Sequence, residues 1–553
     1  MNNKHLITSC HLGWLLSVGI FIGALSGCSS SNSGDGGGGG APTASVSPAD
    51  GATGVERDAM ISATFSEDMF ATTLDSSAVT LSDGNSVAGT VAFDAQTNIV
   101  TFTPTNDLAL LRNYTATLAS TITDLSGNAL AATSWSFTTH DREWGTAELI
   151  ETDNSESSSR PQIALDVSGN AVTVWQQSDG TRHNIWANHY TAGTGWGTAV
   201  LIETDDVGTT LWPQVASDHN GNAVAVWLQS DGTRHNIWAN HYTLGIGWGT
   251  AVLIETDTGF AGAADVAVDA NGNAVAVWRQ SDGTRHNIWG NRYTAGTGWG
   301  TAVLIETDDV GTTRWPQVVS DSNGNAVAVW EQHDGTRYNI WANHYTAGTG
   351  WGTAVLIESD DTGSSQRPQV AFDSNGNAVA VWQRHNGTRN NISANHYTAG
   401  TGWGTAVLIE SDDAGNAEWP QVAFDSNGNA VTVWEQHDGT RQNIWANHYT
   451  TGIGWGTAVL IETDNVGNAF QPDVAVDASG NAVAVWNQLD DTSASAMANR
   501  YVAGSGWGTA AAIENDSGHA DAPRVAVDAN GNVVAVWAQS DGTTDSIMSN
   551  RFE

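Results

Sequence analysis

A short motif, Trp-Gly-Thr-Ala, recurs along the second part of this chain and constrains the fold more than any other feature. Its tryptophans lie 52 residues apart, with one interval of 51, at Trp144, Trp196, Trp248, Trp299, Trp351, Trp403, Trp455 and Trp507. A fixed period of this length indicates a repeat architecture, in which each unit buries its apolar face against the next. Residues 140–553 are therefore predicted to form eight copies of one structural unit.

Each unit contains four runs that are rich in β-branched and aromatic residues. In one unit these runs are Trp299–Glu306, Pro316–Ser320, Ala326–Trp330 and Asn339–Tyr345. Four such strands at this repeat length are typical of a β-propeller blade, whereas a β-helix has a shorter coil. The turn Asp321–Asn325 supplies Asn and Gly for a tight hairpin between two strands.

The phase of the repeats predicts how the ring closes. The array opens with a lone strand at Trp144–Ile150, and its last unit ends at Ile547–Phe552 without a Trp-Gly strand after it. The first strand can fill that vacancy, in a one-plus-three closure that removes an exposed sheet edge. We therefore expect an all-β chain whose repeats form an eight-bladed propeller with four strands per blade.

One segment of the repeats carries a resemblance to known propellers. The pattern Pro-x-Val-Ala-Val-Asp-x-x-Gly-Asn at Pro472–Asn481 resembles NHL-type and sialidase-like propeller repeats. It departs from both, because the unit is longer than an NHL repeat and the gap from Asp477 to Gly480 is one residue longer than in the sialidase Asp-box. The resemblance implies the fold and transfers no activity.

The N-terminal segment is typical of a targeting signal. Residues 1–27 combine the chain's one lysine, Lys4, with an apolar run at Leu12–Leu25, and Leu25-Ser26-Gly27-Cys28 resembles the lipobox of bacterial lipoproteins. The resemblance implies lipidation of Cys28 after removal of residues 1–27. Because Ser29 rather than Asp follows the cysteine, it also implies sorting to the outer membrane of a Gram-negative cell, on either leaflet.

Two segments follow the cysteine. Residues 28–41 are rich in Ser and Gly and are predicted to be a flexible tether. Residues 42–139 contain short alternating strands with frequent turns, which is typical of a β-sandwich. Motifs at Ser47–Val55, Phe65–Met69 and Trp135–Phe137 resemble the bacterial Ig-like domain, which implies a spacer or adhesion module.

Charge limits the partners of the chain. Its 59 acidic and 19 basic residues give a net charge of −40, which opposes binding to nucleic acid and to anionic membrane surfaces. The acidity does not predict disorder, because 24 of the 26 tryptophans lie in the repeats and supply apolar surface. We expect a folded monomer.

Two sets of residues are candidates for ligand binding on one face of the propeller. The Asp-Gly-Thr-Arg loop between the second and third strands recurs with Arg182, Arg234, Arg285, Arg337, Arg389 and Arg441. These arginines either pair with loop aspartates such as Asp179 or donate hydrogen bonds to a ligand. The loop before the inner strand varies most and carries Trp212, Trp315 and Trp419 before its proline. These tryptophans either stack on sugar rings and partner proteins or cover the core.

Other residues point to structure rather than chemistry. Strand tryptophans such as Trp175, Trp186 and Trp196 are predicted to form the core between blades. The histidines of the Asn-His-Tyr motif, such as His189, stand one per unit and predict no metal site. Acidic pairs could bind calcium weakly and are otherwise solvated: Asp205-Asp206, Asp308-Asp309, Asp360-Asp361 and Asp412-Asp413.

The function that these features favour is binding without catalysis. Near-identical loops gain avidity from multivalent contact with a glycan or a surface protein. No unique acid pair, Ser/His/Asp order or nucleophile elbow stands out in the sequence, so no catalytic residue and no cofactor is predicted. The alternatives are a glycosidase or lyase on a propeller frame, and a purely structural envelope protein.

Overall fold

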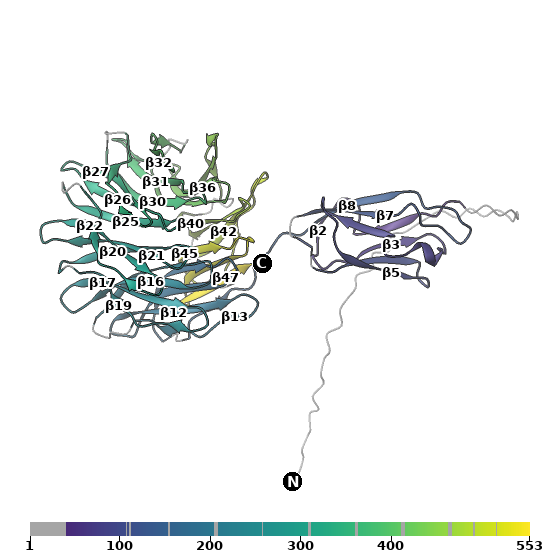
Figure 1. The fold of residues 1–553 in the computed structure, drawn as a ribbon, viewed down its shortest axis with the longest axis horizontal. Helices are drawn as coiled ribbons and strands as arrows, with labels where there is room; N and C mark the ends of the chain where they lie inside the picture. The colour runs from purple at the N-terminus through teal and green to yellow at the C-terminus, as the bar shows by residue number, and fades with distance from the viewer. Residues whose placement is uncertain are drawn as a thin grey trace, which may run out of the picture. The chain divides into compact units, whose positions relative to one another are not determined.

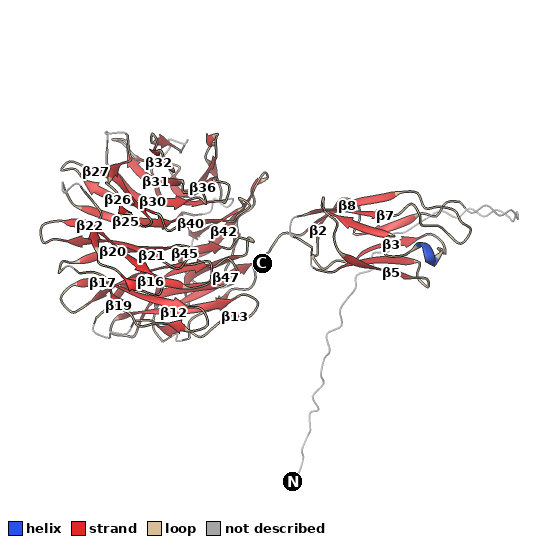
Figure 2. Cartoon of the chain, viewed as in Figure 1, coloured by secondary structure: helices blue, strands red, loops and turns tan. Residues whose placement is uncertain are grey.

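The computed structural model describes residues 40–553 except 107, 110–111, 153–154, 204–207, 257, 308–310, 360–362, 411–414, 463–466, 490–492 and 516. This part of the chain is made of strands, with one short 3-10 helix at Ala71–Thr73 (Figure 2). No helix in it is long and apolar enough to cross a membrane. Three predictions fall on residues outside these ranges: the signal segment, Cys28 and the four acidic pairs considered for calcium.

The chain divides into two compact units, the first ending at Asp141 and the second starting at Arg142. The first unit contains two four-stranded sheets that enclose one core, in which Ile61, Leu81 and Phe137 are fully buried. The prediction of a β-sandwich is confirmed. One sheet has the order β1 (Ala44–Ser47), β3 (Ile61–Phe65), β6 (Ile99–Pro104), β5 (Gly89–Asp94), and the other β2 (Ala52–Val55), β8 (Thr133–Thr139), β7 (Asn113–Leu118), β4 (Val79–Ser82).

The described part of the second unit contains eight antiparallel sheets, which we number blade 1 to blade 8. Their first strands are β10 (Ser158–Leu165), β15 (Thr210–Ser217), β20 (Ala261–Val268), β25 (Thr313–Ser320), β30 (Ser365–Phe372), β35 (Ala417–Phe424), β40 (Ala469–Val476) and β45 (Ala520–Val527). Their second strands are β11 (Ala171–Ser178), β16 (Ala223–Ser230), β21 (Ala274–Ser281), β26 (Ala326–His333), β31 (Ala378–His385), β36 (Ala430–His437), β41 (Ala482–Leu489) and β46 (Val533–Ser540).

The third strands are β12 (His183–Thr191), β17 (His235–Thr243), β22 (His286–Thr294), β27 (Tyr338–Thr346), β32 (Asn390–Thr398), β37 (Gln442–Thr450), β42 (Ala494–Val502) and β47 (Asp545–Phe552). In blades 1 to 7 the outer edge consists of two strands of two residues each, a Gly-Trp strand and a second strand that follows it. These are β13 (Gly195–Trp196) and β14 (Val200–Leu201), β18 (Gly247–Trp248) and β19 (Val252–Leu253), β23 (Gly298–Trp299) and β24 (Val303–Leu304), β28 (Gly350–Trp351) and β29 (Val355–Leu356), β33 (Gly402–Trp403) and β34 (Val407–Leu408), β38 (Gly454–Trp455) and β39 (Val459–Leu460), β43 (Gly506–Trp507) and β44 (Ala511–Ala512).

Blade 8 takes its outer strand from the start of the unit. The strand β9 (Glu148–Leu149) pairs with β47, and the ring of Trp144 lies 5.4 Å from that of Phe552. The first strand of blade 8 also contacts that of blade 1, and in Figure 1 the yellow β47 lies beside the blue β12. The sheets therefore form a closed ring, which confirms the β-propeller and its one-plus-three closure.

The core of the ring lies between the blades. Each second strand carries one tryptophan with no exposed surface: Trp175, Trp227, Trp278, Trp330, Trp382, Trp434, Trp486 and Trp537. Trp278 of blade 3 packs with Val224 and Val226 of blade 2, and Trp175 of blade 1 packs with Ile547 of blade 8. The predicted core between blades is confirmed for the tryptophans of the second strands, whereas Trp186 and Trp196 are half-buried and pack at its edge.

The Asn-His-Tyr motif joins each blade to both neighbours. The asparagine side chain donates a hydrogen bond of 2.7–2.9 Å to an isoleucine carbonyl of the preceding blade in every blade, as Asn240 does to Ile202. The following residue stacks on an aromatic ring of the next blade. His189 lies 5.1 Å from the ring of Tyr242, and arginine takes this place in three blades, as in Arg551 over Tyr190. The motif histidines are therefore packing residues.

Candidate ligand-binding face

A β-bulge interrupts the first strand of every blade. The pairing with the second strand shifts between Ser159 and Gln162 in blade 1 and at the equivalent place in the others. The bulged residues all have a left-handed φ of 46–55°, although none is glycine: Arg160, Trp212, Ala263, Trp315, Arg367, Trp419, Gln471 and Ala522. A left-handed residue with a Cβ costs about 1–2 kcal/mol, and a bulge turns a side chain out of the regular sheet.

The bulge corrects the sequence analysis, which placed these residues in a loop before the inner strand. The structure places them inside the first strand, and the strand continues on both sides of them. Seven of the eight bulged residues precede a proline. Proline has no N–H to donate to a neighbouring strand, so a strand that contains one accommodates it at an edge or a bulge.

The bulged side chains meet around one mouth of the ring. First strands of neighbouring blades contact each other, so they form its inner wall. Trp212 of blade 2 and Trp315 of blade 4 have ring centroids 6.4 Å apart, although blade 3 lies between them. Blade 3 carries only Ala263 at this position, which leaves the space for that contact. We call this surface the mouth face.

Two more contacts continue the ring of bulged residues. The guanidinium of Arg367 lies 3.1 Å from the ring centroid of Trp419, and that of Arg160 lies 5.8 Å from Trp212. Trp315 and Trp419 are 48% and 47% exposed. Trp212 is half-buried, because it also packs against the core between blades 2 and 3. The three predicted tryptophans thus share one face but not one environment.

The arginine loops lie at the same end of the blades, where the second strand turns into the third. In blade 1 the Asp179 carboxylate accepts hydrogen bonds from the hydroxyl and the backbone N–H of Thr181 and from the backbone of Arg182, which hold its pKa well below the usual range. The Nε atom of Arg182 lies 3.4 Å from the same carboxylate. Arg234, Arg285 and Arg337 repeat this pair at 3.4–3.7 Å. These four arginines brace their own loops; a role toward a ligand stays a prediction.

Arg389 differs from the other arginines of the set. In blade 5 an amide, Asn386, takes the place of the loop aspartate, and its side chain accepts a hydrogen bond from the backbone of Arg389. The backbone of Arg441 donates to Asp438 at 2.9 Å. Arg389 therefore has no loop carboxylate in the position where Arg182 has one, and its side chain lies at a cavity.

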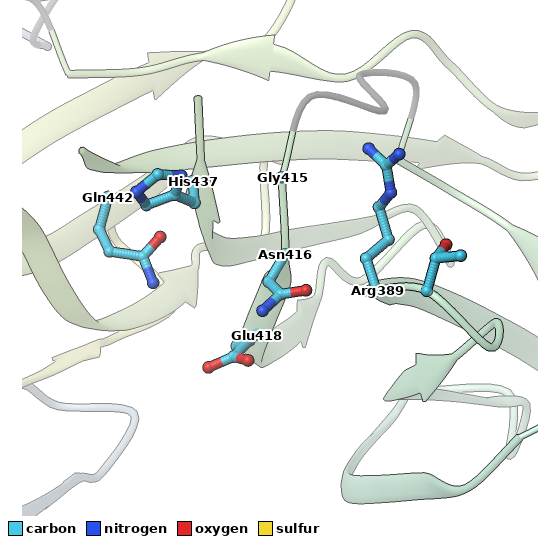
Figure 3. Close-up of a pocket in the computed structure, with 7 residues that line it drawn as sticks. Arg389, Gly415, Asn416, Glu418, His437 and Gln442 are labelled. Carbon is cyan, nitrogen blue, oxygen red and sulfur yellow. The ribbon is translucent and has the colours of Figure 1, made fainter. Parts of the chain in front are cut away.

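The cavity lies between blades 5 and 6 on the mouth face and has a volume of about 500 Å³. Figure 3 shows its lining, which is Thr388, Arg389, Gly415, Asn416, Glu418, His437 and Gln442. A Glu418 carboxylate oxygen accepts a hydrogen bond from Asn390 at 2.7 Å. Except for Arg389, none of these residues was a candidate from the sequence. Glu418 carried a signal, because it departs from the other units: its position holds Leu211 in blade 2.

A cluster of carboxylates surrounds Arg367 beside this cavity. Glu331 accepts a hydrogen bond from the backbone of Arg367 at 2.7 Å, and Glu435 accepts one from Gln471 at 2.8 Å. Glu435 faces Glu418 across the two strands. Burial raises the pKa of Glu435 to about 7, and the charge of Glu418 adds to the rise. No unique acid pair stands out in the sequence, and it is the pairing of the two strands that brings Glu418 and Glu435 together.

Comparison with known proteins identifies the first unit. Residues 40–139 match the family of the bacterial Ig-like domain. A search of curated proteins found no match to the chain.

Solved structures with some likeness to the chain include an α-L-arabinofuranosidase from Fusarium graminearum, at 10% identity and a TM-score of 0.38, with 75% of this chain and 98% of that chain covered. An ulvan lyase matches at 10% identity and a TM-score of 0.42, covering 74% and 93%. A leech intramolecular trans-sialidase matches at 10% identity and a TM-score of 0.36, covering 89% and 93%. Similarity at this level assigns no activity to this chain.

Proposed function

We propose that the propeller binds glycans on its mouth face through the tryptophans of the bulged ring. The observation that carries this proposal is the contact of Trp212 with Trp315 across a whole blade, together with the half-exposed indoles of Trp315 and Trp419 on the same face. An indole offers a large rigid apolar face for a sugar ring, and its N–H can bond a hydroxyl. Eight left-handed residues at equivalent bulges present this ring of side chains, and unfavourable backbone geometry is often concentrated at functional sites.

The differences between the repeats support the same face. The residues that join the blades are the same in nearly every unit, as in Asn188 and Asn240. The bulged residues instead range from Trp to Arg, Gln and Ala. A binding surface with unlike positions around a rim suits a branched or extended ligand, and several weak contacts on one molecule add avidity.

In this proposal the chain is a non-enzymatic lipoprotein of the Gram-negative cell envelope. Cys28 carries the lipid, residues 28–41 act as a tether, and the Ig-like domain separates the propeller from the membrane. Binding needs no cofactor. A surface protein that carries the glycan is an equally suitable partner.

A glycan array with the full chain tests the proposal. Replacement of both exposed indoles, Trp315→Ala with Trp419→Ala, is expected to weaken binding to every positive glycan at least tenfold. The matched control is Ile246→Ala, which removes an 85%-exposed apolar side chain from the turn after a third strand, away from the mouth face. Absence of binding by the unmodified chain, or equal binding by both variants, would contradict the proposal and favour a purely structural role.

The acid pair Glu418 and Glu435 favours one second function, a glycosidase or lyase. A buried carboxyl with a pKa of about 7 beside a second carboxyl can donate and accept protons near neutral pH. Incubation of the chain with each glycan that it binds, followed by product analysis, separates the two functions. Products that disappear in Glu435→Gln while binding persists would establish catalysis; binding without products would support the first proposal.

A further inference from the structure

We infer that the cavity between blades 5 and 6 selects saccharides that carry primary ammonium groups, with Glu418 as the charge partner and Trp419 as the stacking surface. This inference rests on the proposed glycan binding and names its substrate class. The two residues are neighbours on β35: the carboxylate of Glu418 lines the cavity, and the indole of Trp419 beside it carries Arg367 on one ring face and is 47% exposed. An ammonium group forms charge-assisted hydrogen bonds with a carboxylate and is attracted to an aromatic face.

The rest of the lining suits the hydroxyl groups of a sugar. His437 accepts a hydrogen bond from the Gly439 backbone through Nδ1 at 2.9 Å, so the proton of the neutral ring is on Nε2. The side-chain oxygen of Gln442 is buried and has no hydrogen-bond partner. Figure 3 shows Arg389 and His437 on opposite sides of Asn416. The cavity thus combines donors and acceptors, and among its seven lining residues Glu418 is the one carboxylate.

The charges around the cavity favour a cation on the Glu418 side. Glu418, Glu331 and Glu435 all face the guanidinium of Arg367. Burial raises the pKa of Glu435 to about 7, so in mildly acidic buffer Glu435 is mostly protonated and Glu418 is the carboxylate that lines the cavity. Arg389 lines the cavity too and repels a cation from its own side, which leaves the Glu418 side for the ammonium group. The chain as a whole carries a net charge of −40, which attracts cationic ligands and repels anionic ones. Because Glu435 feels the charge of Glu418, a cation bound there would also favour the ionised form of Glu435.

The combination of acid and indole occurs in one blade. The positions equivalent to Glu418 hold Ser159, Leu211, Gly262, Arg314, Gln366, Phe470 and Asp521. Asp521 of blade 8 is the other acid in this set, and the residue after it is Ala522 rather than a tryptophan. The repeat has therefore placed a carboxylate beside an exposed indole at a single point of the mouth face.

Two saccharides that differ in their amino groups test the inference. We would titrate the full chain by calorimetry with a fully deacetylated glucosamine hexamer and with its N-acetylated counterpart, in mildly acidic buffer that keeps the amines protonated. The deacetylated hexamer is expected to bind at least tenfold more tightly. Glu418→Gln should remove most of this preference, measured as the ratio of the two dissociation constants.

The matched control separates a site from general attraction to an acidic protein. Asp521→Asn removes the same charge from the equivalent position of blade 8 and should leave the preference intact. Equal loss in both variants, or a preference that Glu418→Gln does not change, would overturn the inference. Tighter or equal binding of the acetylated hexamer, or no binding of either hexamer, would overturn the inference. The proposed function would still be decided separately, by the glycan array.

Discussion

The two faces of the ring come from the same repeats but differ in how they vary. On the turn face, where first strands end, each Asp-x-x-Gly-Asn turn touches the next: a Cβ on Gly221 would lie 2.7 Å from the carboxylate of Asp166 in the preceding blade. Gly221 also has a φ of 82°, which favours glycine. On the mouth face, equivalent positions carry unlike residues such as Trp315 and Ala263. The contacts that hold blades together leave the mouth face free to diverge.

The largest effect should come from breaking the closure on which both faces depend. Replacement of Trp144–Ile150 by a Gly/Ser segment of the same length removes the outer strand of blade 8, including Ile150, which is 2% exposed. Loss of one buried large side chain costs about 2–5 kcal/mol, so we expect a loss of at least that size in the free energy of unfolding. Urea unfolding of the second unit measures it. An unchanged midpoint would contradict the closure.

A pair of tryptophans in blade 4 separates core from mouth face. Trp330 on β26 has no exposed surface, whereas Trp315 at the bulge of β25 is 48% exposed. We expect Trp330→Ala to lower the free energy of unfolding by about 3–5 kcal/mol. Trp315→Ala should cost less, about 1–3 kcal/mol, because half of its surface is already in water. Similar losses in both variants would mean that the mouth indoles serve as core.

Two asparagines on one strand compare the contacts of the two faces. Asn188 on β12 donates to the carbonyls of Ile150 and Gly197, at 2.7 and 3.1 Å. Asn184, four residues earlier, donates to the exposed Asp179 at 3.1 Å. Asn188→Ala leaves the buried carbonyl of Ile150 without this partner and should cost about 1–3 kcal/mol. Asn184→Ala should cost less, since water can replace its contact with Asp179. The denaturation midpoints of the two variants measure the difference. A larger loss of stability in Asn184→Ala than in Asn188→Ala would contradict the expectation.

The sequence predicted those features of the ring that follow from its repetition. The period of Trp144, Trp196 and their counterparts indicates the blades, the buried strand tryptophans and the closure, because identical units must pack in the same way. The bulge escaped prediction, because a proline after Trp315 favours a loop when strand pairing is unknown. The contact of Trp212 with Trp315 depends on the curvature of three blades.

The acid pair was missed for a related reason. Glu418 and Glu435 are 17 residues apart in the sequence, and only the register of two strands brings them face to face. Local pattern reasoning reaches neighbours within a strand or a turn and does not give such pairings. The stacking of His189 on Tyr242 likewise depends on the distance between two blades.

Acid should weaken the histidine contacts that join neighbouring blades. Burial lowers the pKa of the five stacked histidines below the usual 6.5: His189, His241, His344, His396 and His448. Below that pH the unfolded chain binds more protons than the folded one, so this contribution is complete above pH 6.5 and declines as the pH falls through the folded pKa values.

The natural control is arginine, which stands at the same position in Arg292, Arg500 and Arg551. Replacement of all five histidines by arginine should reduce the loss of unfolding free energy between about pH 7.5 and about pH 5, because no group at these positions then titrates. Chemical denaturation at the two pH values measures the loss. An equal loss in both proteins would assign it to other groups.

The smallest effect tests whether the mouth face stores backbone strain. Ala263 is left-handed with a φ of 46°, and its side chain is a single methyl group, so Ala263→Gly removes the strain and little else. A left-handed alanine costs about 1–2 kcal/mol, and glycine adds about 0.5–1 kcal/mol of unfolded-state entropy, so we expect a net gain of up to about 1 kcal/mol.

In a regular strand the same change has the opposite sign. Ala276, fully buried on β21 of the same blade, is the matched control, and Ala276→Gly should destabilise by about 1 kcal/mol or more. Destabilisation by both changes would mean that the bulge is not strained, and would remove the argument that the repeats accept a cost to present the mouth side chains.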